Sequence, residues 1–456
     1  MKILFVINEI EFADHIAISY LSAIAKELDH STYICILTDN NLINKIKEIK
    51  PDVVAYSVNI TGYKNIIKQH KIAKQKFNFI SIMGGPQSTF YPETFIESGM
   101  DAYCVGEGEY AFRDFLIKIE NKESFDNIEN LITKKRKNDI RYLIENLDEL
   151  PEADRDLIFS NTYLKDSSKK TFYATRGCPY NCNYCCNYYY NNLYRGKGSV
   201  IRRFSVERLI KEIENVKLKY RMDFVKFGDD IFILKADKWL EEFAEKYKKR
   251  INIPFNCYLR FDIVNDDVLK LLTKAGCYSV HLSVDSISPY LRENILNRKM
   301  KKNINIEEKL RKIREYGINT WVNYMLGIPG STIENDLETI MMSKRSRVTF
   351  PHYSITDPIK GTKLFEYCEK NNIIDPSHEG FTDVYGKSVL SCFSDKEKNI
   401  QENICLVGSF ISKLPFPFYK IAIWLIKIIP PNKIFRKINK WFYNYNITHT
   451  IYKILK

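Results

Sequence analysis

Three cysteines, Cys178, Cys182 and Cys185, stand in the stretch TRGCPYNCNYCCN with the spacing C-x3-C-x2-C. They lie on a predicted loop that follows the apolar run TFYAT. Three thiolates can hold three corners of a cuboidal iron–sulfur cluster and leave the fourth iron open to a small molecule. The spacing therefore predicts a 4Fe–4S site whose open corner is the place of the reaction.

A zinc site and purely structural thiols stay open as alternatives for these cysteines. A structural zinc site normally closes with a second paired motif, and no second C-x2-C pair or H-x3–5-H follows in the sequence. Cys186 directly follows Cys185 and is poorly placed to bind the same metal, so we expect it to be a bystander. The remaining cysteines are scattered singly, several in apolar runs, which predicts free thiols in a reduced, intracellular protein.

The spacing, with Tyr184 immediately before the last cysteine, resembles the signature of radical S-adenosylmethionine (SAM) enzymes. In that family the amino and carboxylate groups of SAM chelate the open iron, and one electron from the cluster cleaves SAM to a 5'-deoxyadenosyl radical. The resemblance implies that Tyr184 belongs to the cofactor site and that a flavodoxin or ferredoxin supplies the electron. A cofactor-binding protein without turnover is the alternative, although a passive cluster would gain stability from a fourth ligand.

Residues 171 to 357 alternate apolar strand-like runs with helical patterns, in about six strand–helix units. Parallel strands that are each followed by a helix close into a barrel or partial barrel, with the active site at the carboxyl ends of the strands. Polar residues directly after the predicted strands are therefore the candidates for the site.

The predicted strand ends carry charged residues. Asp229 and Asp230, in FGDDIF, resemble the position that holds the SAM amino group, where a carboxylate faces an ammonium; a helix cap and a surface acid are the alternative. Arg260 could pair with the SAM carboxylate or with a neighbouring acid. Asp285 and Ser286 stand where relatives show a Glu-Ser pair near the SAM ribose and carboxylate, and Asp285 is one methylene shorter than that Glu.

Asn323 and the loop 327–330 (GIPG) resemble the segment that backs the adenosine of SAM. A Gly-Pro turn that leads into a helix would look the same for structural reasons alone. The stretch PIKGTKLF, from Pro358, resembles the end of the barrel in the same enzymes.

The first 120 residues alternate short buried strands with amphipathic helices, which predicts a parallel, doubly wound sheet with ligands beyond the carboxyl ends of its strands. The stretches MGGPQSTFYPE and DAYCVGEGE resemble the cobalamin-binding domain that precedes many radical SAM enzymes. A scaffold domain that binds nothing is the alternative. The candidate cobalamin contacts are Ser57, Asn59, Gly84, Gly85, Gln87 and Glu107.

The sequence departs from the form of this domain that supplies an axial histidine through D-x-H-x-x-G. Asp14-His15 and Asp29-His30 are adjacent pairs without that spacing. We therefore expect cobalamin without a histidine ligand on its lower face.

We predict an α/β fold with four parts. An N-terminal doubly wound, Rossmann-like cobalamin-binding domain occupies 1–125, and a linker with a hairpin occupies 126–165. A partial (β/α)6 radical SAM barrel follows at 166–390, and a helical, basic C-terminal region at 391–456.

The formal net charge of +13 is concentrated at the end of the chain, because residues 413–456 contain nine Lys or Arg and no Asp or Glu. The longest apolar stretch there, 421–429, is interrupted by Lys427 and is far shorter than the roughly 20 residues of a membrane span. A basic, Trp-containing segment can lie on an anionic membrane surface, and a helical cap on the barrel is the alternative. The N-terminus shows no signal peptide, and no specific nucleic-acid module is visible.

With both cofactors present, the leading prediction is methyl transfer to an unactivated carbon of a lipid-like or other secondary-metabolite substrate. Cobalamin-associated oxidation or ring formation without methyl transfer is the alternative, and no residue set identifies the substrate. We expect a cytoplasmic enzyme that works without oxygen and makes peripheral contact with the inner face of the membrane through residues 413–456.

Overall fold

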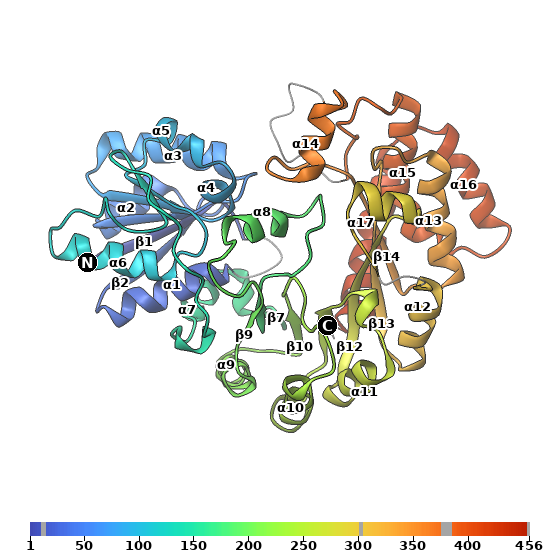
Figure 1. The fold of residues 1–456 in the computed structure, drawn as a ribbon, viewed down its shortest axis with the longest axis horizontal. Coiled ribbons are helices and arrows are strands. Elements are labelled where there is room, and N and C mark those ends of the chain that lie inside the picture. Colours follow the sequence, from blue (N-terminus) through green and yellow to red (C-terminus); the bar gives the residue numbers. More distant parts are fainter. Residues whose placement is uncertain (11–14, 301–303, 375–384, 454–456) are drawn as a thin grey trace. The chain divides into compact units, whose positions relative to one another are not determined.

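The computed structural model describes residues 1–10, 15–300, 304–374 and 385–453 (Figure 1). The chain forms two compact units. The first contains Met1–Ser167, Tyr189–Arg202 and Lys219–Arg221, and the second contains Ser168–Tyr188, Arg203–Leu218 and Met222–Lys456. Each unit is built around its own sheet, so the two are described in turn.

The first unit contains a six-stranded sheet with the order β2-β1-β3-β4-β5-β6. Its first five strands in this order are parallel, and β6 pairs with β5 in the antiparallel direction. The chain order reverses between β1 and β3, which is the point where doubly wound sheets bind ligands. The predicted doubly wound architecture is confirmed. The strands are β1 (Lys2–Ile7), β2 (Ser31–Ile36), β3 (Val53–Ser57), β4 (Ile80–Gly84), β5 (Ala102–Cys104) and β6 (Leu131–Thr133).

Helices join these strands, and buried side chains such as Val6, Tyr56 and Met83 form the core between helices and sheet. The helices are α1 (Ile16–Glu27), α2 (Leu42–Ile49), α3 (Tyr63–Lys76), α4 (Pro86–Phe90), α5 (Phe95–Ser98), α6 (Glu109–Glu120) and α7 (Arg155–Phe159), with 3-10 turns at Pro92–Thr94, Leu147–Glu149 and Tyr163–Lys165. The expected hairpin in 126–165 forms a tight turn in which the Thr133 N–H donates to the Arg136 carbonyl at 2.8 Å. Its first strand is β6, so this segment extends the first sheet.

The second unit contains six parallel strands in consecutive order, β7-β10-β11-β12-β13-β14. Consecutive order with a helix after most strands is the arrangement of a partial barrel, so the predicted (β/α)6 architecture is confirmed. The strands are β7 (Lys169–Phe172), β10 (Phe224–Phe227), β11 (Phe255–Tyr258), β12 (Cys277–Asp285), β13 (Asn319–Leu326) and β14 (Phe350–Ile355), and the short strands β8 (Thr175–Arg176) and β9 (Arg202–Arg203) form a separate pair.

Helices follow most of the strands and continue to the end of the described chain. They are α8 (Cys186–Leu193), α9 (Val206–Lys219), α10 (Lys238–Lys246), α11 (Asp266–Ala275), α12 (Ile306–Glu315), α13 (Ile333–Arg345), α14 (Lys363–Lys370), α15 (Asp395–Ile411), α16 (Phe418–Ile428) and α17 (Lys433–Asn446), with π-helical turns at Tyr247–Ile251, Leu291–Ile295 and Ile447–Ile451 and a 3-10 turn at Phe261–Ile263. Asparagine, aspartate, serine or threonine side chains cap the start of most of them; Thr332, for example, forms a capping box with Asn335 at α13.

The two faces of the barrel sheet have different neighbours. Phe227 packs on Phe243 of α10 with ring centroids 5.6 Å apart, and Tyr353 donates to Ser343 of α13 at 3.1 Å, so these residues face the helices. Because side chains alternate along a strand, Lys226 and His352 face the interior of the barrel. The strand register adds Tyr258, His281, Trp321 and Asn323 to the same inner face.

The last described residues close the amino-terminal end of the barrel. Ile451 and Tyr452 pack with Phe224, Trp321 and Phe350, near the beginnings of their strands, and Ser279 Oγ donates to the Ile451 carbonyl at 2.7 Å. Part of the basic C-terminal region is therefore a barrel cap. None of the helices in the described part of the chain combines the length and apolarity needed to cross a bilayer.

Candidate active site

The cysteine loop is held in place by backbone hydrogen bonds at the carboxyl end of the barrel. The Asn183 N–H donates to the Leu296 carbonyl, and the Leu364 N–H donates to the Asn183 carbonyl, both at 2.8 Å. Asn297 Nδ2 donates to the Asn181 carbonyl at 2.7 Å. The loop is thus clamped between the segment after β12 and the start of α14, which fixes the thiols before any cofactor binds.

The three predicted cluster ligands share one environment. The pKa of Cys178 is raised to about 11, mainly by burial and in part by the charges of Asp230, Cys185 and Cys182. Burial also raises the pKa of Cys182, while Arg298 lowers it. None of the eleven cysteines forms a disulfide.

The three thiols are the donor type that an iron–sulfur cluster takes. Among the described residues, no group of three or more His, Cys, Asp or Glu side chains is arranged to hold one metal ion. A cuboidal iron–sulfur cluster takes cysteine thiolates as ligands, and each thiolate binds a different iron. The donor set of three thiols therefore fits the predicted 4Fe–4S cluster.

The thiol of Cys186 interacts with a neighbouring thiol. Its thiol donates to Cys185, which is the main reason that the pKa of Cys185 is lowered to about 7. Asn187 Nδ2 lies 3.6 Å from Cys185 Sγ as a second donor. Cys186 thus supports the thiolate form of Cys185, which is the form that binds iron.

A buried charge network lies against the loop. Tyr184 Oη donates to Asp285 Oδ2 at 2.8 Å, and Arg298 Nε lies 2.5 Å from the same oxygen. Arg298 also donates to the Ser283 carbonyl at 3.0 Å and approaches Cys182 Sγ at 4.0 Å. Asp285 has a φ of +60°, a strained conformation for a residue with a side chain. The network fixes Tyr184 and places a cation beside Cys182, one of the predicted cluster ligands.

The paired aspartates have separate roles. Asp229 is buried, and its Oδ1 accepts hydrogen bonds from the Ala174 N–H at 2.8 Å, the Thr175 N–H at 2.5 Å and Thr175 Oγ1 at 2.9 Å. Burial raises its pKa to about 7. Asp230 is exposed to water; burial of the surrounding site raises its pKa, and a hydrogen bond with Asn187 lowers it. Asp229 therefore shapes the chain before the cysteine loop, and Asp230 is the carboxylate that is open to a ligand.

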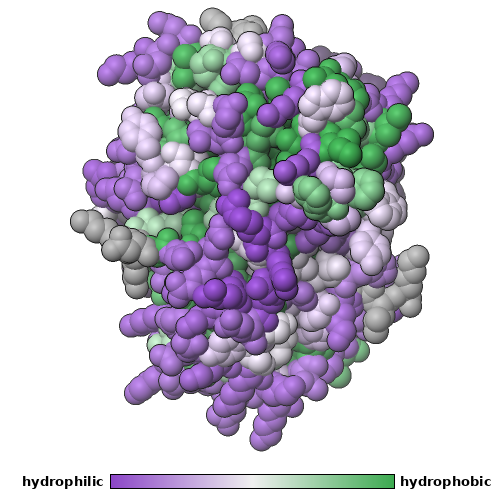
Figure 2. Space-filling model, turned by 90° about the vertical axis from the view of Figure 1, so that its right-hand side faces the viewer, coloured by the Kyte–Doolittle hydropathy of each residue, from purple (hydrophilic) through white to green (hydrophobic). Residues whose placement is uncertain are grey.

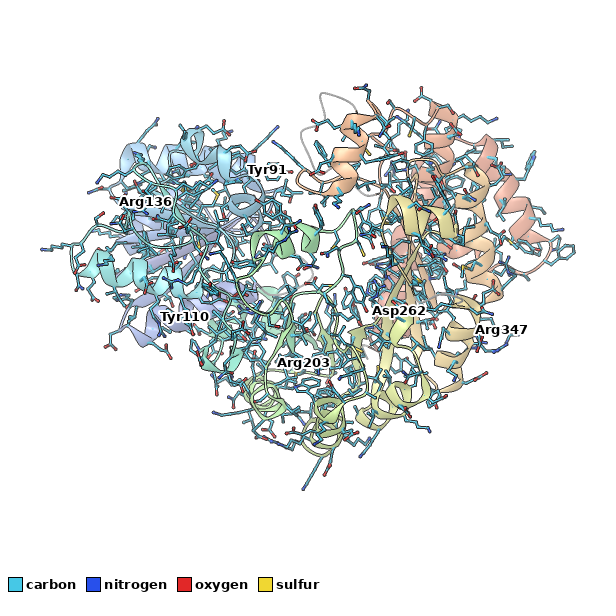
Figure 3. The ribbon with its side chains drawn as sticks, in the orientation of Figure 1. Tyr91, Tyr110, Arg136, Arg203, Asp262 and Arg347 are labelled. Carbon is cyan, nitrogen blue, oxygen red and sulfur yellow. The ribbon has the colours of Figure 1, made fainter. Side chains whose placement is uncertain are left out.

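Three further candidates already have protein partners. Arg260 donates to Asp262 Oδ2 at 2.7 and 3.0 Å (Asp262 is labelled in Figure 3), and its guanidinium lies 3.6 Å from the ring centroid of Tyr180. Asn323 Oδ1 accepts from Trp321 Nε1 at 2.9 Å, and Ser286 Oγ accepts from a backbone N–H at 3.2 Å. Arg260 thus braces the cysteine loop through Tyr180.

The interior of the barrel is aromatic and basic. His281 is stacked between Tyr258 and Trp321, with ring centroids 4.3 and 4.4 Å away. Burial lowers the pKa of Lys226, lowers the pKa of His352 to about 4 and lowers the pKa of His281 well below its usual value. From β10 to β14, the inner positions up to Ser283 carry no carboxylate. Over these strands the lining therefore offers neutral imidazoles, ring faces and one lysine.

The predicted cobalamin edge of the first unit is built from backbone and small side chains. Gly84, paired with Ser57 across β3 and β4, has open space where a side chain would lie. Gly85 has a φ of +97°, and a Cβ there would lie 2.9 Å from the Val58 carbonyl oxygen, so only glycine fits. The Gln87 N–H donates to the Val58 carbonyl at 3.0 Å, and Asn59 Oδ1 accepts from the Gly62 N–H at 2.8 Å.

Glu107 has a different environment from the other candidates of the first unit. Its carboxylate accepts from both terminal nitrogens of Arg202, at 2.8 and 2.9 Å, and from the Ile144 N–H at 3.3 Å. Tyr194 Oη accepts from the Glu107 N–H at 2.6 Å. Its carboxylate therefore ties three segments together.

The histidines of the first unit are engaged within the protein. His70 is buried between Tyr56 Oη at 3.1 Å and the Gly99 carbonyl at 3.3 Å, and burial lowers its pKa to about 4. His30 lies 3.2 Å from the amino group of Met1, before β2 begins, and His15 lies 3.1 Å from the Glu9 carbonyl. These contacts agree with the expected absence of a histidine ligand to cobalamin, which stays a prediction.

Arg298, Asn187 and Tyr180 were not predicted from the sequence. Arg298 is separated from Asp285 and Cys182 in the chain, and only the fold brings the three together. Asn187 and Tyr180 lie within the cysteine stretch. Their closeness to the thiols in the sequence was the signal that could have identified them as part of the site.

Comparison with known proteins adds an independent finding. The B12 binding domain model matches residues 11–116, and the Radical SAM superfamily model matches residues 172–342. An uncharacterized methyltransferase of Pyrococcus horikoshii, PH0819, is 27% identical over 375 residues, which cover 79% of each chain.

Two solved structures have the same fold. The radical SAM methyltransferase TsrM from Kitasatospora setae, solved with cobalamin and a 4Fe–4S cluster, is 16% identical with a TM-score of 0.66, over 94% of this chain and 91% of that one. The cobalamin-dependent SAM radical enzyme OxsB is 17% identical with a TM-score of 0.70, over 99% of this chain and 75% of that one. The similarity extends over both units.

Proposed function

The chain belongs to the radical SAM enzymes that carry a B12 binding domain, and we propose that it transfers a methyl group to an unactivated carbon of a lipid-like or other secondary-metabolite substrate. Its cofactors are a 4Fe–4S cluster, SAM and cobalamin. When bound, they supply a radical initiator, a source of methyl groups and a methyl carrier. The protein's own residues bind and orient these groups.

In this proposal the second unit holds the charged cofactors. Cys178, Cys182 and Cys185 bind the cluster, and Asp230 faces the SAM amino group as an open carboxylate. The network of Tyr184, Asp285 and Arg298 keeps the cysteine loop rigid, so little ordering is needed when SAM binds.

The first unit holds cobalamin at the edge formed by Ser57, Asn59, Gly84 and Gly85, with Gln87 behind it. Space beside Gly84 and exposed backbone suit a large flat ligand, which gains more from close contact than from ion pairs. No role in binding is needed for Glu107, whose carboxylate is used by Arg202.

The barrel interior supports a substrate with a planar or unsaturated part. Tyr258, His281 and Trp321 offer ring faces, and Lys226, without a carboxylate beside it on the inner face, favours a negative group on the substrate. An amphiphilic molecule with a conjugated or isoprenoid part and an acidic group fits these features.

The observation that carries the proposal is the C-x3-C-x2-C set of thiols on a loop clamped by backbone hydrogen bonds, in a chain that also has a B12 binding domain. A flavodoxin or ferredoxin is the proposed electron donor. We also propose that the enzyme meets its substrate at the inner face of the membrane, where residues 413–456 make peripheral contact.

Isotope transfer tests the proposed reaction. Anaerobically reconstituted protein is incubated with methyl-labelled SAM, a reductant and either the lipid or the polar extract of the source cells, and products are followed by mass spectrometry. We expect label in a new product that does not form with Cys185→Ala. A turned-over product without label would contradict methyl transfer and favour oxidation or ring formation.

A further inference from the structure

Exposed apolar side chains are concentrated in one short part of the chain. Of the sixteen large apolar residues that are exposed in the described part of the protein, nine lie between residues 416 and 445. Figure 2 shows the face of the second unit on which α16 lies, with hydrophobic side chains gathered in its upper part. A concentration of exposed apolar side chains of this kind often marks an interaction surface.

Helix α16 is apolar on both of its faces. Its inner face packs through Ile426, which is 2% exposed, and Asn403 of α15 donates to the carbonyls of Ile426 and Ile429 at 3.0 and 2.7 Å. Its outer face is a stripe with three- and four-residue spacing, hereafter the α16 stripe. The α16 stripe consists of Phe418, Ile421, Trp424 and Ile428, which are 59%, 50%, 59% and 56% exposed.

The α16 stripe has basic residues along one edge. Lys420 and Lys427 are both exposed and are seven residues apart, so they lie on the same side of the helix. Lys433 and Lys437 follow in α17, where Ile434 is 68% exposed. No Asp or Glu occurs in residues 413–456, and within the described part of this region the one cation paired with an acid is Arg436, with Glu402 of α15.

We propose that α16 lies flat on an anionic lipid bilayer, with the α16 stripe in the boundary between headgroups and acyl chains. Lys420 and Lys427 then reach lipid phosphates while their carbon chains stay on apolar surface. Aromatic residues such as Trp424 are favoured at this depth. The helix, its face and the lipid charge are now specified for the proposed membrane contact. The contact depends on the proposed function only for the reason why the enzyme would bind a membrane.

Charge decides between a membrane and a second protein copy. A second copy would place Lys420 and Lys427 against the same lysines or near them, because twofold interfaces are self-complementary. An anionic bilayer instead compensates every one of these cations. Asn403 of α15 anchors α16, and Glu402 of α15 anchors α17 through Arg436, so α16 is held ready without further folding.

Vesicle sedimentation tests the proposal with the full, cofactor-loaded chain. Vesicles of phosphatidylcholine with about 30% phosphatidylglycerol are compared with pure phosphatidylcholine, since anionic headgroups attract nearby lysines. We expect binding to the anionic vesicles alone, and its loss in the double variant Ile421→Glu, Trp424→Glu. The double variant Lys420→Gln, Lys427→Gln should bind about 25-fold more weakly, from roughly fivefold for each lysine.

A matched control is the double variant Ile96→Glu, Leu218→Glu, because these side chains are 89% and 84% exposed but lie outside the C-terminal region. It should bind vesicles within about twofold of the original chain, since it leaves every basic residue of that region in place. Equal binding to neutral vesicles, equal loss in the control, or no loss in either test variant would overturn the proposal. A dimer that forms without vesicles and is abolished by Ile421→Glu, Trp424→Glu would instead assign the α16 stripe to a second copy.

Cofactor measurements separate this test from the proposed reaction. Iron content, cobalamin content and SAM cleavage should be unchanged in all three double variants. If vesicle binding fails while labelled methyl still reaches a product, the proposed membrane contact is wrong and the proposed methyl transfer stands. If the chain binds vesicles but the product carries no label, methyl transfer is wrong and the membrane contact stands.

Discussion

The strand ends of the two units differ in how they use charge. In the second unit, Arg260 is paired with Asp262, and Arg298 with Asp285, all with buried side chains. In the first unit, the candidate edge consists of glycines, amides and a hydroxyl, and its one candidate carboxylate, Glu107, is occupied by Arg202.

This difference matches two kinds of ligand. A buried charge needs a fixed partner, and breaking such a pair is costly, so the second unit is rigid around its cysteine loop. Such a site suits cofactors that carry charge themselves. An open backbone edge without free charges suits a large flat ligand that is held by contact area. The comparison predicts that charge changes harm the second unit most, and volume changes the first.

The largest effect is expected at the cluster ligands. Cys178→Ala, Cys182→Ala or Cys185→Ala each removes one predicted iron ligand and should abolish the cluster, measured as iron per chain and visible absorbance after reconstitution. Cys186→Ala is the matched control and should retain the cluster, because the Cys186 thiol forms a hydrogen bond with Cys185 and is not one of the predicted iron ligands. Loss of iron in Cys186→Ala equal to that in the other three would mean that a different set of thiols binds the cluster.

The next effect is on stability. Arg298→Met keeps the side-chain volume but leaves Asp285 buried without its cation, so we expect a loss of about 3–5 kcal/mol in the free energy of unfolding. Arg345→Met, which breaks two ion pairs at a half-exposed site, should cost at most about 1 kcal/mol. Denaturant unfolding of the cofactor-free proteins measures both; equal small losses would show that the buried network is not a rigid support.

A pH effect follows from Asp229. Its pKa is raised to about 7 in the folded chain, against about 4 when unfolded. Between these pH values the folded state therefore binds one more proton than the unfolded state. The contribution of Asp229 to the free energy of unfolding is complete at low pH and is lost as the pH rises through about 7. In the original chain, the free energy of unfolding should fall by a few kcal/mol between about pH 5 and 8. Asp229→Asn keeps an oxygen for the Ala174 and Thr175 N–H groups but cannot titrate, so this fall should disappear.

Unfolding curves at the two pH values check this expectation. Asp395→Asn, at a fully exposed acid whose pKa is lowered by Lys387, is the control and should leave the original slope unchanged. A slope that persists in Asp229→Asn would show that this carboxyl does not titrate in that range.

The smallest effect is expected at the open edge of the first unit. Gly84→Leu fills the space beside β4 and should weaken cobalamin retention at least about tenfold while leaving iron content unchanged. Gly84→Ala should keep most of the cobalamin, since a methyl group meets no atom within 4 Å in the protein. Retention that is equal in both variants, measured by gel filtration and absorbance, would place cobalamin elsewhere.

The sequence predicted both sheets because their strands are short, apolar and regularly alternated with amphipathic helices. The cysteine spacing is a local pattern, so the cluster site could also be predicted from the sequence. What could not be predicted depends on distant contacts. Asp229 and Asp230 look alike in the chain, yet the turn at Thr175 takes one of them into the core. Arg298 meets Asp285 only after β12 and the π-helical turn are formed.

The C-terminal region shows the same limit. Its basic, aromatic composition indicated either a cap or a membrane surface. The structure places Ile451 and Tyr452 under the barrel and leaves Trp424 outside, so one region combines a packed cap with an exposed stripe. The composition of the whole region does not distinguish its packed residues from its exposed ones. The distinction comes from packing against β10, β13 and β14.

The most direct test of the central claim is product analysis of the loaded protein. The chain is reconstituted anaerobically with iron, sulfide and cobalamin, supplied with SAM and a reductant, and assayed for 5'-deoxyadenosine and S-adenosylhomocysteine. We predict both products from the original chain, loss of 5'-deoxyadenosine alone in Cys185→Ala, and reduced S-adenosylhomocysteine in Gly84→Leu. Absence of both products from a chain with a full cluster and bound cobalamin would contradict the account.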